Sequence, residues 1–312
     1  MLGYHSSFEC HFKIDDPCKR GLAVDPEKLL DIASNLVEAG RLEEARIAYD
    51  SAIRLDPCNW HGFLGRARVN VSLNSISDAI SDYGRVTAID NDNSEAYLAL
   101  GRLLEDKEEF KQAVAAYRQV IKLCPNSKPA YFRRAFCYER IEQYSLAVQD
   151  YKSIVSLDHA DALAYRRCGR ALGLRGDLRE AATCFDNAIA LSANNASDYF
   201  HRGLINQQLG LIVEAIADYS DCLSRDSTNQ KALLNRGNSY LKSGQLTESL
   251  ADYDALISHN PRHIKAHFNR ASCCVKLGRI EEALIEYRFV LDSDCGEQLK
   301  GRAQAQLNKL GD

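Results

Sequence analysis

The sequence predicts an all-α repeat protein, and three periodic observations support this prediction. Small residues recur every 34 residues in two series, and the second series stands twelve positions before the first. An aromatic residue recurs at the same interval, four positions after the first series. A fixed period of this length indicates one supersecondary unit copied end to end, in which each copy buries its apolar face against its neighbours. The function of such a chain should lie on its surface.

Eight copies of 34 residues account for residues 26–297 without an insertion or a deletion. We expect the copies to span 26–59, 60–93, 94–127, 128–161, 162–195, 196–229, 230–263 and 264–297. Within a copy, positions 8 and 20 are small and position 24 is aromatic. The series are Ala33, Ala67, Gly101, Ala135, Gly169, Gly203, Gly237 and Ala271 at position 8, Ala45, Ala79, Ala113, Ala147, Ala181, Ala215, Ser249 and Ala283 at position 20, and Tyr49, Tyr83, Tyr117, Tyr151, Phe185, Tyr219, Tyr253 and Tyr287 at position 24. Small residues allow two helices to approach closely, and the ring fills the space beside them.

Each copy is predicted to form a helical hairpin. Apolar positions 4, 8 and 11 and then 17, 20, 24 and 27 are spaced by three or four residues, which is typical of two amphipathic helices. A turn near position 15 separates the two groups. Glycine marks this turn in five copies, at Gly40, Gly176, Gly210, Gly244 and Gly278.

These positions resemble the tetratricopeptide repeat, which also favours an apolar residue at position 27 and a proline at position 32. The prolines at position 32 are Pro57, Pro125 and Pro261, and the other five copies lack one. The resemblance covers residues 26–297. It implies a right-handed α-α superhelix, or solenoid, of eight hairpins whose first helices line a concave groove that binds peptides or proteins without chemistry of its own.

The two ends of the chain do not repeat. Residues 298–312 place four apolar side chains on one helical face, as expected of a C-terminal capping helix that shields the last hairpin. These side chains are Leu299, Ala303, Leu307 and Leu310. Residues 1–25 show no period and carry Tyr4, Phe8 and Phe12. They either dock on the first copy or remain loose.

The composition argues against several classes of partner. The net charge is −4, no block of like charge suggests nucleic-acid binding, and no window of 18 apolar residues suggests a membrane span. The N-terminus lacks the features of a secretion signal. The eleven cysteines mostly occupy apolar helix positions, which favours free thiols in a reducing compartment, so we expect a cytoplasmic protein.

Five copies carry a matched pair of opposite charges within the hairpin. Position 7, usually apolar in the family, is arginine, and position 23 is acidic in the same five copies only. The pairs are Arg66 with Asp82, Arg134 with Asp150, Arg202 with Asp218, Arg236 with Asp252, and Arg270 with Glu286. Because an unpaired buried charge costs several kcal/mol, we predict that each arginine bonds the acid of its own hairpin and fixes helix registry.

The residues expected to face a partner occupy positions 2, 5, 6, 9, 12 and 13 of each first helix. The candidates are Arg68, Arg102, Arg133, Arg166, Arg167, Arg170, His201, Lys231, Asn235, Asn238, Lys265 and Asn269. Arginine forks suit carboxylates and asparagine amides suit a peptide backbone, so this face predicts a protein or extended peptide partner, which the arginines suggest is acidic. A solvated face of mixed charge is an equal alternative, because Glu105, Asp106 and Glu139 oppose the cations.

We therefore predict a non-catalytic scaffold or adaptor within a multiprotein assembly, and two alternatives stay open. Some tetratricopeptide co-chaperones grip the acidic C-terminal tail of Hsp70 or Hsp90, and Arg166, Arg170, His201, Lys231 and Asn235 match that pattern in part. The chain could also be the substrate-recognition module of a larger enzyme. Assembly with further copies of itself is open as well.

No catalytic motif, cofactor site or metal site is predicted. The chain has no HExxH, Walker A loop, GxSxG elbow or paired CxxC. His259, His263 and His267 have a four-residue interval, but Pro261 breaks the helix that would place them on one face.

A second candidate cluster lies outside the repeats. Cys10, His11 and Cys18 have seven residues between the two thiols, a spacing that fits no common zinc site.

Overall fold

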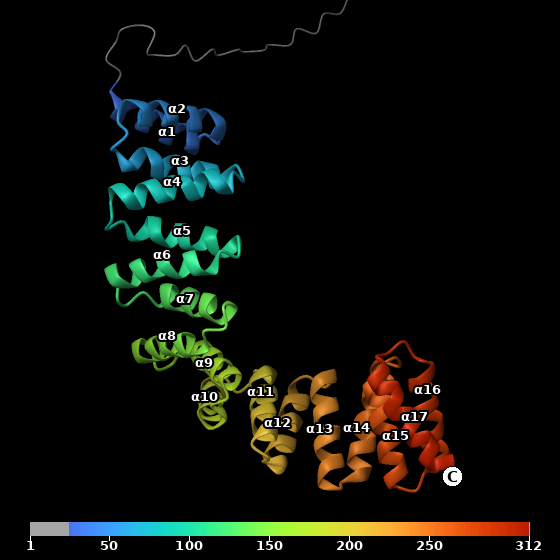
Figure 1. Cartoon of the computed structure of the whole chain (residues 1–312). Coiled ribbons are helices and arrows are strands. Elements are labelled where there is room, and N and C mark those ends of the chain that lie inside the picture. The colour runs from blue at the N-terminus through green and yellow to red at the C-terminus, as the bar shows by residue number, and fades with distance from the viewer. Residues whose placement is uncertain (1–24, 312) are drawn as a thin grey trace, which may run out of the picture. The chain divides into compact units, whose positions relative to one another are not determined.

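The computed structural model describes residues 25–311, and every regular element in this range is an α-helix (Figure 1). The helices are α1 (Pro26–Glu38), α2 (Leu42–Leu55), α3 (Trp60–Ser72), α4 (Ile76–Ile89), α5 (Ser94–Asp106), α6 (Phe110–Leu123), α7 (Lys128–Arg140), α8 (Tyr144–Leu157), α9 (Ala162–Arg175), α10 (Leu178–Leu191), α11 (Ala196–Gln208), α12 (Ile212–Arg225), α13 (Gln230–Ser243), α14 (Leu246–His259), α15 (Ile264–Lys276), α16 (Ile280–Asp292) and α17 (Glu297–Gly311). The predicted all-α solenoid of helical hairpins is confirmed. Tyr4, Phe8, Phe12, Cys10, His11 and Cys18 lie outside the described residues.

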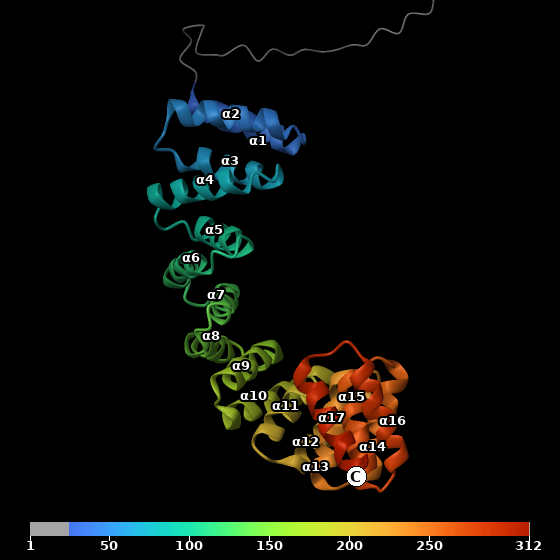
Figure 2. The same ribbon diagram turned by 45° about the vertical axis from the view of Figure 1, so that its right-hand side comes forward.

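The chain divides into two compact units, and the division falls between Ala130 and Tyr131 in the first turn of α7. In the first unit, α1 to α6 form successive hairpins, with each second helix packed against the first helix of the next hairpin (Figures 1 and 2). Its core includes Phe63 and Ala67 of α3 and Ala79 and Tyr83 of α4, all less than a tenth exposed.

The second unit continues the same pattern from α8 to α16 and ends with α17 against the last hairpin (Figure 2). Four apolar side chains of α17, at the spacing expected of a cap, pack on a core built from α14, α15 and α16. These side chains are Leu299, Ala303, Leu307 and Leu310. The helix covers apolar surface that the last hairpin would otherwise expose.

Side-chain caps start the first helices. An aspartate or asparagine directly before the helix, which is position 34 of the preceding copy in all but copy one, accepts a hydrogen bond from a backbone N–H of the first turn, and His263 does so in the last hairpin. The carboxylate and amide caps are Asp25, Asn59, Asn93, Asp161, Asn195 and Asn229. Each satisfies a donor that the helix start leaves free.

The turn at position 15 requires a left-handed backbone in every copy. The five predicted glycines have φ between 73° and 98°, and the other three copies adopt φ of 59° to 60° at Asn74, Glu108 and Glu142. A non-glycine residue in this region costs about 1–2 kcal/mol. The packing of the two helices therefore sets the turn, and glycine only makes it easier to form.

The ring at position 24 packs against the small residue at position 8. A Cβ added at Gly101, Gly203 or Gly237 would stand closer than 3.0 Å to the tyrosine ring of its own hairpin. Four of the position 24 rings are also anchored by a hydrogen bond that the phenol donates. Tyr117 donates to Glu105 at 2.7 Å, and Tyr219 donates to Gln207 at 2.8 Å.

None of the helices described is long and apolar enough to cross a membrane.

The packing predicts opposite outcomes for two Gly-to-Ala substitutions inside helices of the first unit. At Gly65 a Cβ would stand closer than 3.0 Å to the buried ring of Tyr49, whereas at Gly84 no atom lies within 4 Å. We expect Gly65→Ala to lower the free energy of unfolding by about 1–2 kcal/mol through overpacking. Gly84→Ala should raise it by about 0.5–1 kcal/mol through helix propensity. Urea titrations followed by circular dichroism measure both, and a stabilising Gly65→Ala would contradict the packing described.

Candidate functional site

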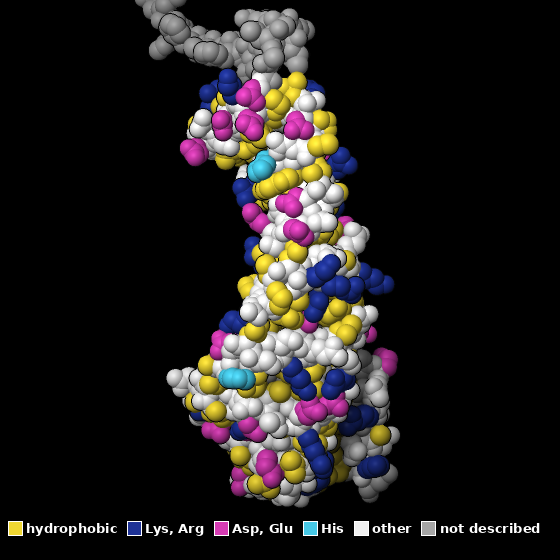
Figure 3. Space-filling view, turned by 90° about the vertical axis from the view of Figure 1, so that its left-hand side faces the viewer, with side chains coloured by type: hydrophobic (Ala, Val, Ile, Leu, Met, Phe, Trp, Pro, Cys, Tyr) yellow, Lys and Arg dark blue, Asp and Glu magenta, His cyan; other side chains and the backbone are white. Residues whose placement is uncertain are grey.

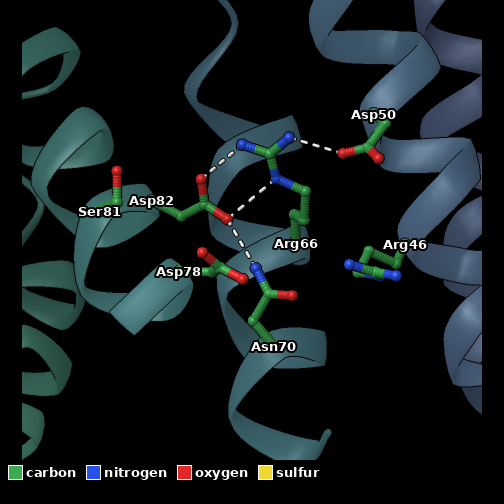
Figure 4. Close-up of a pocket in the computed structure, with 7 residues that line it drawn as sticks. All are labelled: Arg46, Asp50, Arg66, Asn70, Asp78, Ser81 and Asp82. Atoms are coloured by element: carbon green, nitrogen blue, oxygen red, sulfur yellow. Dashed lines mark hydrogen bonds and ion pairs between the residues drawn. The ribbon is translucent and has the colours of Figure 1, made fainter. Parts of the chain in front are cut away.

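The arginines at position 7 lie between successive hairpins rather than at the surface of one. Arg66 of α3 donates from Nε and Nη2 to Asp82 of α4 at 2.9 and 2.6 Å (Figure 4). From Nη1 it also donates to Asp50 of α2 at 2.6 Å. Asn70 donates to the same Asp82 carboxylate at 3.0 Å. A single guanidinium thus ties three helices together.

The bond to the acid of the same hairpin recurs at the other four arginines. Arg134 donates to Asp150 at 2.6 and 2.8 Å, and Arg236 donates to Asp252 at 2.6 and 2.9 Å. The remaining pairs, Arg202 with Asp218 and Arg270 with Glu286, bond at 2.5–3.0 Å and 2.9 Å. All five arginines therefore lie against the acid of their own hairpin.

Sequence reasoning missed a second acceptor, which comes from position 25 of the preceding copy. This residue lies 16 positions before the arginine, as the acid of the hairpin lies 16 positions after it. The acceptors are Asp50 for Arg66, Asp186 for Arg202, Ser220 for Arg236 and Asp254 for Arg270. A search for acceptors on both sides of each arginine would have found them. The arginine bridges therefore connect neighbouring hairpins as well as the two helices of one hairpin.

Burial weakens the energetic benefit of two of these pairs. It raises the pKa of the Asp150 and Asp218 carboxyls above their ordinary value, although Arg134 and Arg202 oppose the rise. In copy five the pair is replaced by Cys168 and Cys184, and the hydrogen bond with Cys184 together with burial raises the pKa of the Cys168 thiol. The copy with thiols keeps the same helical hairpin, so the ion pair is not needed to form it.

The first-helix face, defined by positions 2, 5, 6, 9, 12 and 13 of each first helix, carries the remaining candidates. Five of its cations are exposed: Arg68, Arg102, Arg170, Lys231 and Lys265. Arg68 forms an ion pair with Glu95, and both side chains are more than half exposed. Among the described residues, Arg102, Arg170, Lys231 and Lys265 make no ion pair.

Arg166 differs from the other candidates because it is committed to an internal carboxylate. It contacts Asp198 of α11 through Nε and Nη2, the latter at 2.7 Å, and Asp198 is fully buried. Asp198 stands at position 3, where the other copies carry lysine, glycine or alanine. The pair links α9 to α11 and leaves Arg166 little capacity for a partner.

Several candidates on the first-helix face of the second unit lie within electrostatic range of one another. Burial lowers the pKa of His201, and the positive charges of Arg170 and Lys231 lower it further. Arg167 and Arg170 both act on the Tyr151 phenol. The face therefore brings Arg170 and Lys231 near the His201 imidazole, and Arg167 and Arg170 near the Tyr151 phenol.

The asparagines of the last two hairpins form a network instead of standing free. Asn269 donates to Asn238 at 2.7 Å, and the Tyr253 phenol donates to the same amide oxygen at 2.8 Å. Asn235 and Arg133 are half-buried. On the side of the molecule drawn in Figure 3, charges of both signs are interspersed with apolar side chains.

The histidines with a four-residue interval have separate roles. His259 ends α14, His263 caps α15 at 3.2 Å from the Ala266 nitrogen, and His267 contacts Glu286 and the Pro261 carbonyl. Within residues 25–311, no group of three or more His, Cys, Asp or Glu side chains is placed to hold a metal ion.

Stacked helical hairpins with a polar first-helix face define a protein-interaction scaffold. A family model described as tetratricopeptide repeat matches residues 30–96 and 234–294, and a second model of that description matches residues 94–137. The chain belongs to the tetratricopeptide repeat family.

Solved structures with the same fold include three proteins of low identity. The MamA protein is 25% identical with a TM-score of 0.52, and the match covers 55% of this chain and 94% of MamA. YrrB is 20% identical with a TM-score of 0.52, covering 59% of this chain and 95% of YrrB. PilF of Pseudomonas aeruginosa is 16% identical with a TM-score of 0.56, covering 68% and 97%. No curated protein sequence matches the chain.

The buried bridges predict strong energetic coupling between Arg236 and Asp252. The Asp252 side chain is 6% exposed, so Arg236→Ala leaves a buried carboxylate unpaired and should cost about 3 kcal/mol. In a double-mutant cycle with Asp252→Ala, measured by urea unfolding, we expect a coupling energy above about 1 kcal/mol. The exposed pair Arg68 and Glu95 is the control and should couple by less than about 1 kcal/mol. Equal coupling in both cycles would contradict the role given to the buried bridges.

Proposed function

We propose that this protein is a non-catalytic adaptor that holds an extended acidic segment of a partner protein against its first-helix face. The observation that carries the proposal is the group of cations Arg167, Arg170 and Lys231 in the second unit. They lie within electrostatic range of shared neighbours, and in the described part of the chain none makes an ion pair with a carboxylate. The nearby carboxylates of Glu139 and Asp198 are bonded to Tyr151 and Arg166, so a bound carboxylate would give these cations a direct partner.

The contrast with the buried arginines supports this assignment. The position 7 arginines already hold one or two acceptors, so a ligand would have to displace an internal bridge to reach them. Arg170 is exposed and requires no such exchange. A guanidinium binds a carboxylate through two parallel hydrogen bonds, which gives orientation as well as attraction.

A reducing location such as the cytoplasm fits the cysteines. All nine cysteines in the described part of the chain are free thiols, and five of them are buried as small apolar side chains. We propose that the partner is a member of a multiprotein assembly in that compartment.

A grip on an acidic C-terminal tail has weaker support. The partial clamp requires Arg166 and His201, but Arg166 is bonded to buried Asp198 and burial lowers the pKa of His201. An extended segment does not need either group.

The proposal predicts that binding of an acidic peptide depends on salt and on Arg170. We expect a blocked peptide of alternating glutamate and glycine to bind, and its glutamine counterpart to bind much less. Arg170→Gln should raise the dissociation constant roughly two- to fivefold, as expected for the loss of an exposed charge pair. Raising the ionic strength from 0.05 to 0.5 M, the latter well above the roughly 0.15 M of cells, should weaken binding further through screening.

The matched control is Arg179→Gln, which removes an exposed arginine from the second helix of the same hairpin. Fluorescence anisotropy measures the affinity of the wild-type protein and of each variant for the acidic and the neutral peptide. Equal affinity for the acidic and neutral peptides, or an equal effect of the two substitutions, would rule out the proposed face.

A further inference from the structure

Copy five lacks a hydrogen bond that joins the two helices of the hairpin in the neighbouring copies. In copies four and six the phenol at position 24 donates to the side chain at position 12: Tyr151 donates to Glu139 at 2.7 Å and Tyr219 donates to Gln207 at 2.8 Å. In copy five, position 24 is Phe185 and position 12 is Gly173. Both partners of the bond are absent from the same hairpin.

A cavity of about 270 Å³ lies at this point, between α9, α10 and α11. Its lining includes Gly169, Gly173 and the apolar side chains of Leu174, Phe185, Leu204 and Ile205, together with the polar side chains of Arg170, His201 and Gln208. The Phe185 ring is 1% exposed and stacks on His201, with ring centroids 5.7 Å apart. Leu174, which also lines the cavity, is 60% exposed.

The size of the cavity suits one apolar side chain. An apolar cavity of about 150 Å³ in another protein accommodates benzene, and pockets for drug-sized ligands begin near 300 Å³. The space in copy five falls between these limits. It is therefore large enough for a leucine or phenylalanine side chain and too small for an extended small-molecule ligand.

The charges near the cavity indicate which kind of peptide residue should lie next to the apolar side chain. Arg170 lines the cavity, is exposed and makes no ion pair in the described part of the chain. Lys231 and Arg170 both act on His201, and no carboxylate lines the cavity. The Asp198 carboxylate also acts on His201, but it is already bonded to Arg166. A peptide residue next to the apolar one would gain from carrying a carboxylate.

We propose that the cavity in copy five receives a leucine or phenylalanine side chain from the partner peptide, while an adjacent carboxylate of that peptide bonds Arg170. This inference rests on the proposed binding of acidic peptides to the first-helix face. It adds a specific anchor to that face, which fixes the register of the peptide along the repeats. A repeating charged face alone would allow the peptide to slide.

A binding experiment with two peptides and two variants tests the anchor. The probes are a short blocked peptide with one leucine flanked by glutamates and the same peptide with alanine in place of leucine. The closing variant, Phe185→Tyr with Gly173→Gln, installs the pair seen in copy six without a change of charge. A Cβ at Gly173 would lie 3.0 Å from the flexible end of Ile205, so the hairpin should still fold, which circular dichroism checks. The second variant is Arg170→Gln.

We expect the wild-type protein to bind the leucine peptide at least roughly tenfold more tightly than the alanine peptide. The closing variant should lose this preference and keep its affinity for the alanine peptide. Arg170→Gln should weaken the binding of both peptides and leave the preference for the leucine peptide unchanged.

Failure of the anchor and failure of the proposed function give different results. If the wild-type protein binds both peptides equally well, or if the closing variant keeps the preference for leucine, the anchor is wrong and the acidic face stands. If neither peptide binds, both proposals are wrong.

Discussion

The close approach of an aromatic ring to a residue with little or no side chain is the contact on which the rest of the structure depends. In copies three, six and seven the ring of Tyr117, Tyr219 or Tyr253 occupies the space where a Cβ at position 8 would stand. This contact sets the separation of the two helices in a hairpin. The left-handed turn at position 15 and the spacing of side chains on the first-helix face follow from that separation.

The arginine bridges act on top of this packing. Each joins the two helices of one hairpin, and four of them also reach the hairpin before, so they set how neighbouring copies align. Burial raises the pKa of two of their acids, which agrees with pairs that specify geometry more than they add stability. The same bridges separate internal arginines from those available to a partner.

Recurrence decided what could be predicted from the sequence. The small and aromatic residues and the matched charges within a hairpin recur at fixed positions, so eight copies expose them even without a structure. The bridge from Arg66 to Asp50 joins two copies, so the match of charges within one copy does not reveal it. Asp198 is the sole acid at position 3, and a feature present once has no period to reveal it. The cavity beside Gly173 and Phe185 could not be predicted from the sequence, because it depends on how three helices pack together.

The most direct measurement of the central claim is amide hydrogen exchange with and without the leucine peptide flanked by glutamates. If the first-helix face binds the peptide, added protection should concentrate in α9, α11 and α13, with the largest change near Gly173 and His201. Protection confined to the second helices α10, α12 and α14 would contradict the account, because it would place the partner on the opposite side of each hairpin.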